Sequence, residues 1–110
     1  MKQAVVIETS GESRTIELDG TLEQLQSEVG GLIEAVTLPN GLTMWLNEEG
    51  KLQQLDHNQQ AQVIFDHSFG PGVDIVLGNA VITGGADEDG ETLGLTDEQL
   101  LVYRFVGAVR

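Results

Sequence analysis

The chain has 110 residues, and 40% of them are hydrophobic, which suits a single domain with one hydrophobic core. Its 18 Asp and Glu residues against five Lys and Arg give a formal net charge of −13, so direct nucleic-acid or membrane binding is not expected. The absence of cysteine excludes disulfides and thiolate metal sites, and the N-terminal apolar run is too short for a signal peptide. We therefore expect one cytoplasmic domain over residues 1–110.

The N-terminal third predicts a β-hairpin followed by a helix. Residues 4–8 and 13–18 are short runs with β-branched side chains, separated by a polar turn that contains a glycine. A helix is expected to begin at Thr21, because Thr21 and Gln24 have the spacing of a capping box, and to end at Gly30. The residues predicted to form its buried stripe are Leu22, Leu25 and Val29.

The middle of the chain predicts a second hairpin and a second helix. Residues 32–38 and 42–47 resemble strands and are joined through an Asn-Gly pair, which favours a hairpin. A helix is expected over residues 57–67 with Asp56 as its N-cap, and the Gly-Pro-Gly sequence that follows would end it. Its predicted buried side consists of Ala61, Ile64 and Phe65.

The last third predicts a long strand, an acidic loop and a terminal segment. Residues 73–83 form an apolar run typical of a strand, with a bulge expected at Gly78 and Asn79. Residues 84–95 would then be a loop, and Thr96 and Gln99 have the spacing of a second capping box. The β-branched residues over 101–110 are compatible with either a helix or a strand.

The order of these elements, β-β-α-β-β-α-β-α, predicts the α+β class. We expect a single domain with a mixed, mainly antiparallel sheet of about five strands. Two or three helices would pack on one face of this sheet. The order of elements is similar to that of the β-grasp fold, and a fold alone does not imply a function.

Three stretches of the chain carry a resemblance to a known family. They are GGLIEAVTL at 30–38, WLNEEGKL at 45–52 with Asn58 and Ala61 after it, and DIVLGNAVITGGADEDGETLGLTDEQ at 74–99. The pattern GGxIEAV, NEEGKL, GNAVxTGGADxxGET resembles an uncharacterised family of small phage and actinobacterial domains, catalogued as a domain of unknown function. The resemblance implies a phage or mobile-element setting and brings no catalytic residues with it. It marks a turn and one later position: Asn47, Glu48, Glu49, Gly50 and Asn58.

The acidic stretch over 84–99 invites comparison with a calcium loop. With Gly90 at the sharp turn of an EF-hand loop, Asp87 and Asp89 occupy ligand positions three and five. The first and last ligand positions would be Gly85 and Thr96, which cannot supply the required carboxylates. We therefore expect a solvated acidic loop, whose candidate partner-facing residues are Asp87, Glu88, Asp89 and Glu91.

No residue pattern points to catalysis, to a metal or to a cofactor. His57 and His67 lie nearly three helical turns apart, about 15 Å, so one metal ion cannot bridge them. Ser68 follows His67 directly, and adjacency in sequence does not make a catalytic triad. The glycine-rich stretches lack the lysine of a phosphate-binding loop. The sequence thus favours a protein that is not an enzyme.

Trp45 is the single tryptophan of the chain and alternates with Leu42, Met44 and Leu46. If those three residues face the helices, Trp45 lies on the opposite face of the sheet. It would there be covered by the C-terminal segment, the alternative that we favour, or be exposed at a partner surface.

These observations leave three hypotheses about function. The first is a small accessory protein of phage or mobile-element type that binds another protein with a basic surface, and a homodimer is also compatible with the sequence. The second is a DNA mimic that inhibits a host defence nuclease of the restriction or CRISPR type. The third is a small-molecule-binding domain with a pocket between the sheet and the second helix. The acidic composition can also serve solubility alone.

Overall fold

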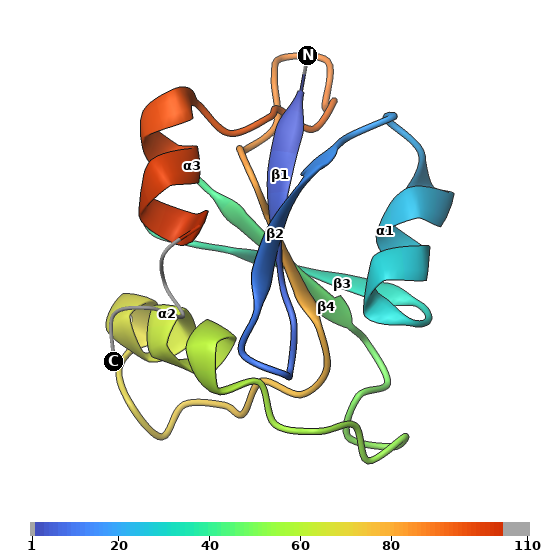
Figure 1. The fold of residues 1–110 in the computed structure, drawn as a ribbon, viewed down its shortest axis with the longest axis vertical. Coiled ribbons are helices and arrows are strands. Elements are labelled where there is room, and N and C mark those ends of the chain that lie inside the picture. The colour runs from blue at the N-terminus through green and yellow to red at the C-terminus, as the bar shows by residue number, and fades with distance from the viewer. Residues whose placement is uncertain (1, 105–110) are drawn as a thin grey trace.

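A computed structural model describes residues 2–104 of the chain, and Figure 1 shows its fold. The expected α+β class and order of elements are confirmed. The elements are β1 (Gln3–Ile7), β2 (Ser13–Glu17), α1 (Leu22–Val29), β3 (Ile33–Thr37), β4 (Thr43–Asn47), α2 (Gln59–Phe69), β5 (Ala80–Thr83) and α3 (Asp97–Arg104). None of the helices in the described part of the chain is long and apolar enough to cross a membrane.

The five strands form one sheet in the order β2-β1-β5-β4-β3. The β1–β2 and β3–β4 pairs are the two expected hairpins, and β5 lies between them. All four pairings among the described strands are antiparallel, so the expected antiparallel character is confirmed, and no parallel pair of a mixed sheet occurs among these strands. The strands at the two edges are therefore β2 and β3.

Helices cover both faces of the sheet, so the expectation that they share one face is wrong. Figure 1 shows α1 on one side of the sheet and α2 and α3 on the other. Val5 and Ile7 of β1 belong to the core beneath α2 and α3, whereas Ala4 and Val6 belong to the smaller core beneath α1. Four consecutive buried residues in one strand require apolar cover on both sides, because successive side chains point to opposite faces.

Helix α1 has the predicted caps but not the full predicted stripe. The Thr21 side chain accepts the backbone N–H of Gln24, and Gly30 ends the helix in the left-handed conformation, with φ of 80°. Leu25 and Val29 are buried, whereas Leu22 is 52% exposed. The prediction for Leu22 is wrong because the first turn of α1 borders an open cleft instead of the core.

Helix α2 begins at Gln59 with Asn58 as its N-cap, so the prediction of Asp56 is wrong. The Asn58 side-chain oxygen accepts the backbone N–H of Ala61 at 3.1 Å, while its amide donates to Ile7 O and Gly78 O at 2.8 and 2.9 Å. These contacts hold Asn58 fully buried at the cap. The predicted residues Ala61, Ile64 and Phe65 are buried, and Gln60 is buried in addition.

The strand predicted over 73–83 is confirmed only for Ala80–Thr83. The preceding segment pairs with the amide side chain of Gln62 on α2, which accepts Val76 N–H at 2.7 Å and donates to Asp74 O at 2.9 Å. Gly78 then turns the chain into β5 with φ of +82°. The same segment also pairs with the backbone before α2, since Asn58 N–H donates to Val76 O at 3.0 Å and Gly78 N–H donates to Asp56 O at 2.7 Å. Because these partners lie outside the sheet, Val73 and Ile75 stay exposed.

Helix α3 begins with the second predicted capping box. Gln99 N–H donates to the Thr96 hydroxyl at 3.2 Å, and Thr96 N–H donates to Gln99 Oε1 at 2.8 Å. The helix runs through Arg104, so the first four residues of the ambiguous 101–110 segment are helical. Residues 105–110 lie outside the described part of the chain.

Candidate functional site

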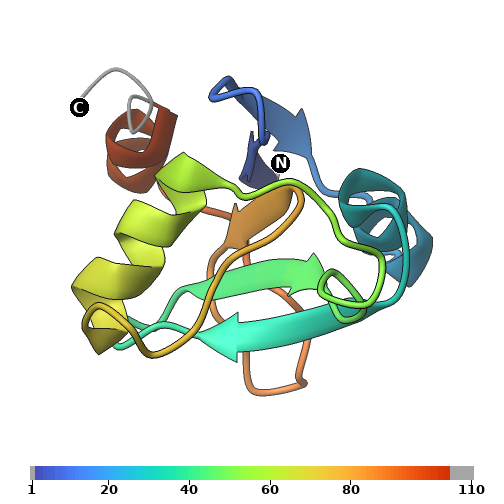
Figure 2. The same ribbon diagram turned by 90° about the horizontal axis from the view of Figure 1, so that it is seen from below.

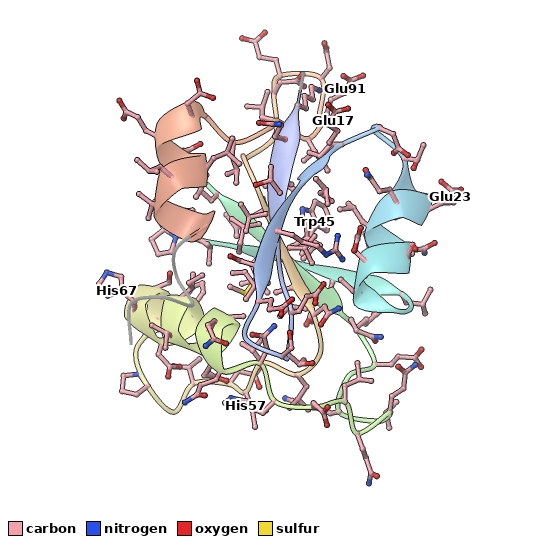
Figure 3. All side chains as sticks on the ribbon, in the orientation of Figure 1. Glu17, Glu23, Trp45, His57, His67 and Glu91 are labelled. Atoms are coloured by element: carbon pink, nitrogen blue, oxygen red, sulfur yellow. The ribbon has the colours of Figure 1, made fainter. Side chains whose placement is uncertain are left out.

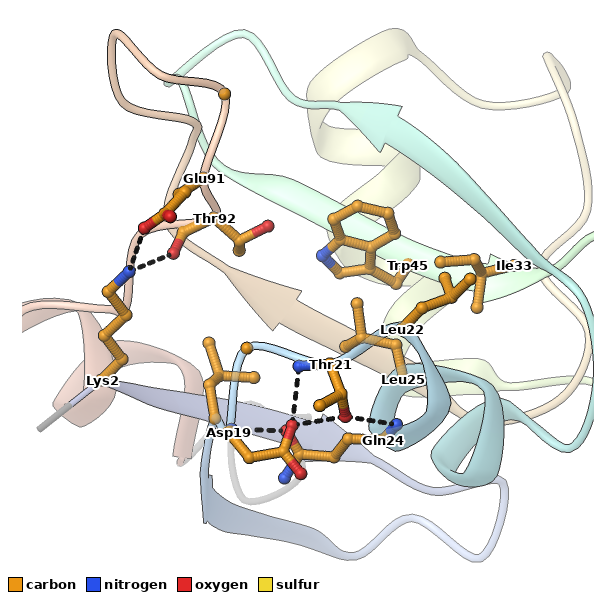
Figure 4. Close-up of a pocket in the computed structure, with 13 residues that line it drawn as sticks. Lys2, Asp19, Thr21, Leu22, Gln24, Leu25, Ile33, Trp45, Glu91 and Thr92 are labelled. Atoms are coloured by element: carbon orange, nitrogen blue, oxygen red, sulfur yellow. Dashed lines mark hydrogen bonds and ion pairs between the residues drawn. The ribbon is translucent and has the colours of Figure 1, made fainter.

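An open cleft of about 780 Å³ lies between the sheet, the first turn of α1 and the loop that follows β5. Figure 4 shows the residues that line it. Its apolar residues are Leu18, Leu22, Leu25, Ile33 and Trp45, and its polar rim includes Lys2, Asp19, Thr21, Gln24, Glu91 and Thr92. A volume of this size is within the usual range of ligand-binding pockets.

The indole of Trp45 is fixed in place at this cleft. Its Nε1–H donates to the Thr83 hydroxyl at 2.9 Å, and that hydroxyl donates to Gly84 O at 2.9 Å. The ring therefore stays oriented although the side chain is only partly buried. The prediction that Trp45 faces away from Leu42, Met44 and Leu46 is confirmed, because Trp45 packs with the α1 core and the others with the α2–α3 core.

The favoured cover for Trp45 is wrong for the described part of the C-terminal segment. Helix α3 packs on the opposite face through Leu100, whereas α1 lies on the side of Trp45. The C-terminal helix is on the other face because its apolar residues pack beside Val5 and Met44 in the larger core. The part of the Trp45 side chain that the core does not cover is turned toward the cleft, as Figure 4 shows.

The first wall of the cleft is the capped N-terminus of α1. One carboxylate oxygen of Asp19 accepts the Thr21 hydroxyl at 2.6 Å and the Thr21 N–H at 2.8 Å. Gln24 completes the cap by accepting the Asp19 N–H at 3.0 Å and donating to Glu17 O at 2.6 Å. The hydroxyl bond and then the backbone bond from Thr21 lower the pKa of the Asp19 carboxyl, so it remains ionised at neutral pH.

The second wall is the acidic loop between β5 and α3, which folds as a small hairpin. Leu93 N–H donates to Gly85 O at 2.7 Å, and Asp87 N–H donates to Glu91 O at 2.9 Å. Asp87 also uses its carboxylate to accept the N–H groups of Asp89 and Glu91, each at 2.9 Å. The carboxylate of Asp87 therefore organises the turn, and those of Glu88 and Asp89 project from its exposed tip.

Lys2 ties this hairpin to the N-terminal strand at the rim of the cleft. Its Nζ donates to Thr92 O at 3.1 Å and lies 3.8 Å from the Glu91 carboxylate. Gly94 lets the hairpin pass close to β1, because a Cβ there would lie 2.8 Å from the backbone of Lys2 and Gln3. The one lysine of the cleft is thus already paired with an acidic residue.

Negative charge is in excess over the rest of the described surface as well as at the cleft. The Lys and Arg side chains that the structure describes, Lys2, Arg14 and Lys51, each contact at least one carboxylate. The hydrogen bonds that Arg14 donates to Glu28 and then to Glu8 raise the pKa of Arg14 above its usual value. Figure 3 shows Glu17 and Glu91 at one end of the molecule, and Glu23 on α1, around the side that carries Trp45.

Among the residues marked by the family pattern, Asn47, Gly50 and Asn58 have structural roles. Asn47 is buried and donates to Val29 O and Gln53 Oε1 at 3.2 Å each, while it accepts the Glu49 N–H at 2.7 Å. Gly50 leaves little room for a side chain, since a Cβ would lie 3.3 Å from Leu77 O. Glu48 is exposed, and neither it nor Asn58 lines the cleft beside Trp45.

The two histidines do not come together in a site. The His57 ring lies 3.1 Å from Gln62 Oε1, and His67 is in the last turn of α2. Among the residues that the structure describes, no group of three or more His, Asp or Glu side chains is placed to hold a metal ion.

A second open cleft, of about 400 Å³, lies between the sheet and α2, where the small-molecule hypothesis expects a pocket. Val36, Phe65, Phe69, Val73 and Ile75 are among its lining residues. It is a groove instead of an enclosed cavity, since Val73 and Ile75 are 62% and 50% exposed.

Sequence reasoning identified Trp45 and Glu91 but missed the other residues of the cleft beside Trp45. Asp19 had a local signal, because an acidic residue two positions before a Thr N-cap can accept its N–H. Lys2 had none, because its contact with Thr92 joins residues 90 positions apart.

Comparisons with curated proteins and with solved structures find no match to this chain. A family model described as "Domain of unknown function (DUF3846)" matches residues 1–106, almost the entire length. The chain therefore belongs to the DUF3846 family of domains of unknown function.

Proposed function

We propose that this domain binds a partner protein, without catalysis, through the cleft beside Trp45. The partner would present an apolar side chain next to a lysine or arginine. The observation that carries this proposal is an oriented, partly exposed tryptophan within an open cleft whose rim includes Asp19 and Glu91.

Both halves of this chemistry have a counterpart in the cleft. Trp45, Ile33 and Leu22 offer apolar surface that a partner could cover, and tryptophan is enriched at the centres of protein interfaces. The rim carboxylates attract a cation, and the face of an indole binds guanidinium and ammonium groups. Because Lys2 is paired with Glu91, the cleft has no free described cation that would repel such a partner.

The proposed setting is that of a small cytoplasmic accessory protein of a phage or another mobile element. The family pattern supports the genomic setting, and the lack of cysteine agrees with a reducing compartment. The net charge of −13 supports a basic protein partner over nucleic acid or a membrane.

The test uses Trp45 as a reporter, since it is the single tryptophan of the chain. The probe is the capped tripeptide Leu-Arg-Leu, with Leu-Glu-Leu as its matched control, titrated to millimolar concentration. We expect the basic peptide to shift or quench the Trp45 fluorescence, and added salt to weaken this response. An equal response to both peptides, or none to either, contradicts the proposal.

Two variants link this response to the rim. Asp19→Asn and Glu91→Gln each remove one carboxylate of the cleft and should weaken binding of the basic peptide about threefold to tenfold. Glu12→Gln, which removes an exposed carboxylate outside the cleft, is the matched control and should leave binding unchanged. A loss as large in the control would mean that net charge alone drives binding.

DNA mimicry is the second candidate, and the observation in its favour is the exposed tip of the acidic hairpin. Glu88 and Asp89 project from this tip beside Asp87, whose position is fixed by the turn. A mimic would compete with DNA for a restriction or CRISPR nuclease, with steep salt dependence. The double variant Glu88→Gln, Asp89→Asn should then reduce inhibition of the nuclease, while leaving the response of Trp45 to the basic peptide intact.

A further inference from the structure

The outer side of β3 is an unused edge of the sheet. Leu38 N–H donates to Leu42 O, and Glu48 N–H donates to Leu32 O, at the two ends of the β3–β4 ladder. Hydrogen-bonded pairs alternate along an antiparallel ladder, so the pairs Glu34–Leu46 and Val36–Met44 are hydrogen-bonded as well. The N–H and C=O groups of the other three residues point away from β4: Ile33, Ala35 and Thr37.

No other described segment takes up these groups. β3 is the last strand of the sheet, as Figure 2 also shows, and no described residue outside the ladder hydrogen-bonds to Ile33, Ala35 or Thr37. Ala35 and Thr37 are exposed. The edge therefore offers three donors and three acceptors in the spacing that a further strand requires.

The opposite edge of the same sheet is different. On β2, Gln24 donates to Glu17 O at 2.6 Å, Ser13 is engaged by a partner, and α3 packs against the strand. The β2 edge is thus partly covered by other parts of the chain, whereas the β3 edge is left open.

The side chains beside the open edge define what a further strand would carry. Glu34 and Val36 lie on the face of the second cleft, next to Phe69, Val73 and Ile75. An added strand would place side chains beside Glu34 and Val36, and an antiparallel strand would place them directly opposite, in the closer, non-hydrogen-bonded positions. A basic residue opposite Glu34 would pair with its carboxylate. An apolar residue two positions away would lie opposite Val36 and cover the groove of Phe69 and Val73.

We propose that the β3 edge is a strand-addition site for an extended segment of a partner protein that carries a basic and an apolar residue two positions apart. Backbone bonds to Ile33, Ala35 and Thr37 hold the segment, and Glu34 with the apolar groove selects it. This surface meets the cleft beside Trp45 at Ile33, whose side chain lines the cleft while its backbone groups belong to the edge. The two proposals use different groups, and either can hold without the other.

A second copy of this chain fits the edge poorly. Strand β3 has no basic residue to place opposite Glu34, and the neighbouring Lys51 is bound to Asp74 at 2.7 Å. Two copies would also bring together two chains of net charge −13. A basic segment removes both repulsions, so charge complementarity favours a different protein.

The probe is the capped peptide Thr-Lys-Thr-Val-Thr-Lys-Thr, whose sequence is the same in both directions, so that no strand orientation is assumed. Its matched control replaces both lysines by glutamate. Amide hydrogen exchange of the protein, followed by NMR, should slow at Ile33, Ala35 and Thr37 when the basic peptide is added. The amides of Glu34 and Val36, already bonded to β4, should change little.

The variant Ala35→Pro isolates the edge from the fold, because the Ala35 N–H points outward and is not part of the ladder. It should weaken binding of the peptide at least about tenfold while the far-ultraviolet circular dichroism stays native. Ala35→Thr keeps the N–H and should bind as the wild type does. Glu34→Lys should exchange the preference of the domain from the lysine peptide to the glutamate peptide.

Three results would overturn this proposal. The first is no change in exchange at the three outward amides with the basic peptide at millimolar concentration. The second is unchanged binding by Ala35→Pro. The third is protection of the same amides that grows with protein concentration without peptide, which would assign the edge to a second copy. The Trp45 fluorescence assay with the tripeptides is independent of all three, so failure of one proposal is distinguishable from failure of the other.

Discussion

The two faces of the sheet are built from the same strands but differ in how completely they are covered. The face beneath α2 and α3 holds a continuous core that includes Val5, Ile7, Met44 and Ile82, all fully buried. The face beneath α1 has a smaller core, and one end of it opens into the cleft beside Trp45. The comparison indicates that stability resides mainly on the first face, which leaves the second free to present side chains to a partner.

The two buried asparagines provide the test with the largest expected effect of whether the two faces contribute differently to stability. Asn58→Ala removes the buried side-chain donor that bonds to both Ile7 O and Gly78 O, and we expect a loss of about 4 kcal/mol in the free energy of unfolding. Asn47→Ala should cost about 2 kcal/mol, because only one of the two groups to which Asn47 donates, Val29 O, is buried, whereas Gln53 is exposed. Urea unfolding of both variants measures the difference, and equal losses would mean that the two faces are equally well packed.

A second pair of variants compares the faces within a single strand. Val5 and Val6 are adjacent, fully buried and identical in size, but Val5 faces α2 and α3 whereas Val6 faces α1. We expect Val5→Ala to cost about 3 kcal/mol and Val6→Ala about 1.5 kcal/mol, because the thinner layer can relax into the cavity. A larger loss for Val6→Ala in thermal or urea unfolding would reverse the assignment of the main core.

Variants at the N-caps of α1 and α3 distinguish an effect on stability from an effect on the cleft beside Trp45. Thr21→Ala and Thr96→Ala each remove an N-cap hydroxyl, and each should cost about 1 kcal/mol. Only Thr21 borders the cleft, so only Thr21→Ala should change the Trp45 emission of the folded protein. An equal change in the Thr96 variant would indicate that α3 also controls the environment of Trp45.

The smallest expected effect is a dependence on pH at the same cap. The folded-state pKa of Asp19 lies below its ordinary value of 3.8, so its stabilising contribution is present above that pH and is lost as the pH falls through the folded-state pKa. The melting temperature of the wild type should therefore exceed that of Asp19→Asn at neutral pH. The two curves should converge in acid below pH 3.8, and a constant gap down to pH 2 would contradict the assignment.

Interactions between near neighbours in sequence could be predicted, whereas those between distant segments could not. Thr21 with Gln24, and Thr96 with Gln99, are three residues apart, so spacing alone was enough to predict both caps. The prediction of Asp56 as the cap of α2 is wrong although the cap bond of Asn58 is local as well, from the Ala61 N–H three residues on. The sequence does not show that the Asn58 amide also bonds to Ile7 O, 51 positions away, and this long-range bond fixes the helix start at Asn58. Residues 73–79 do not form the expected strand for a similar reason, since their backbone bonds go to the Gln62 amide and to the backbone of Asp56 and Asn58.

The sequence contains one signal against the expectation that the helices share one face of the sheet. Four consecutive apolar residues, Ala4 to Ile7, indicate a strand buried on both faces, and this conflicts with helices on one face only. The cleft itself had a partial signal in Trp45, whose alternation with Met44 and Leu46 placed it on the second face. The rim of the cleft could not be predicted, because Lys2 and the acidic hairpin are far apart in sequence and come together only in the folded chain.

The position of β5 in the sheet constrains how the chain assembles during synthesis. The two hairpins are complete by Asn47, yet the strand that joins them, Ala80–Thr83, comes 33 residues later. A nascent chain that stops before β5 has two separate hairpins, each with an unpaired apolar edge at β1 or β4. Cooperative folding therefore awaits the emergence of β5 from the ribosome, and shortened products should be bound by chaperones or degraded.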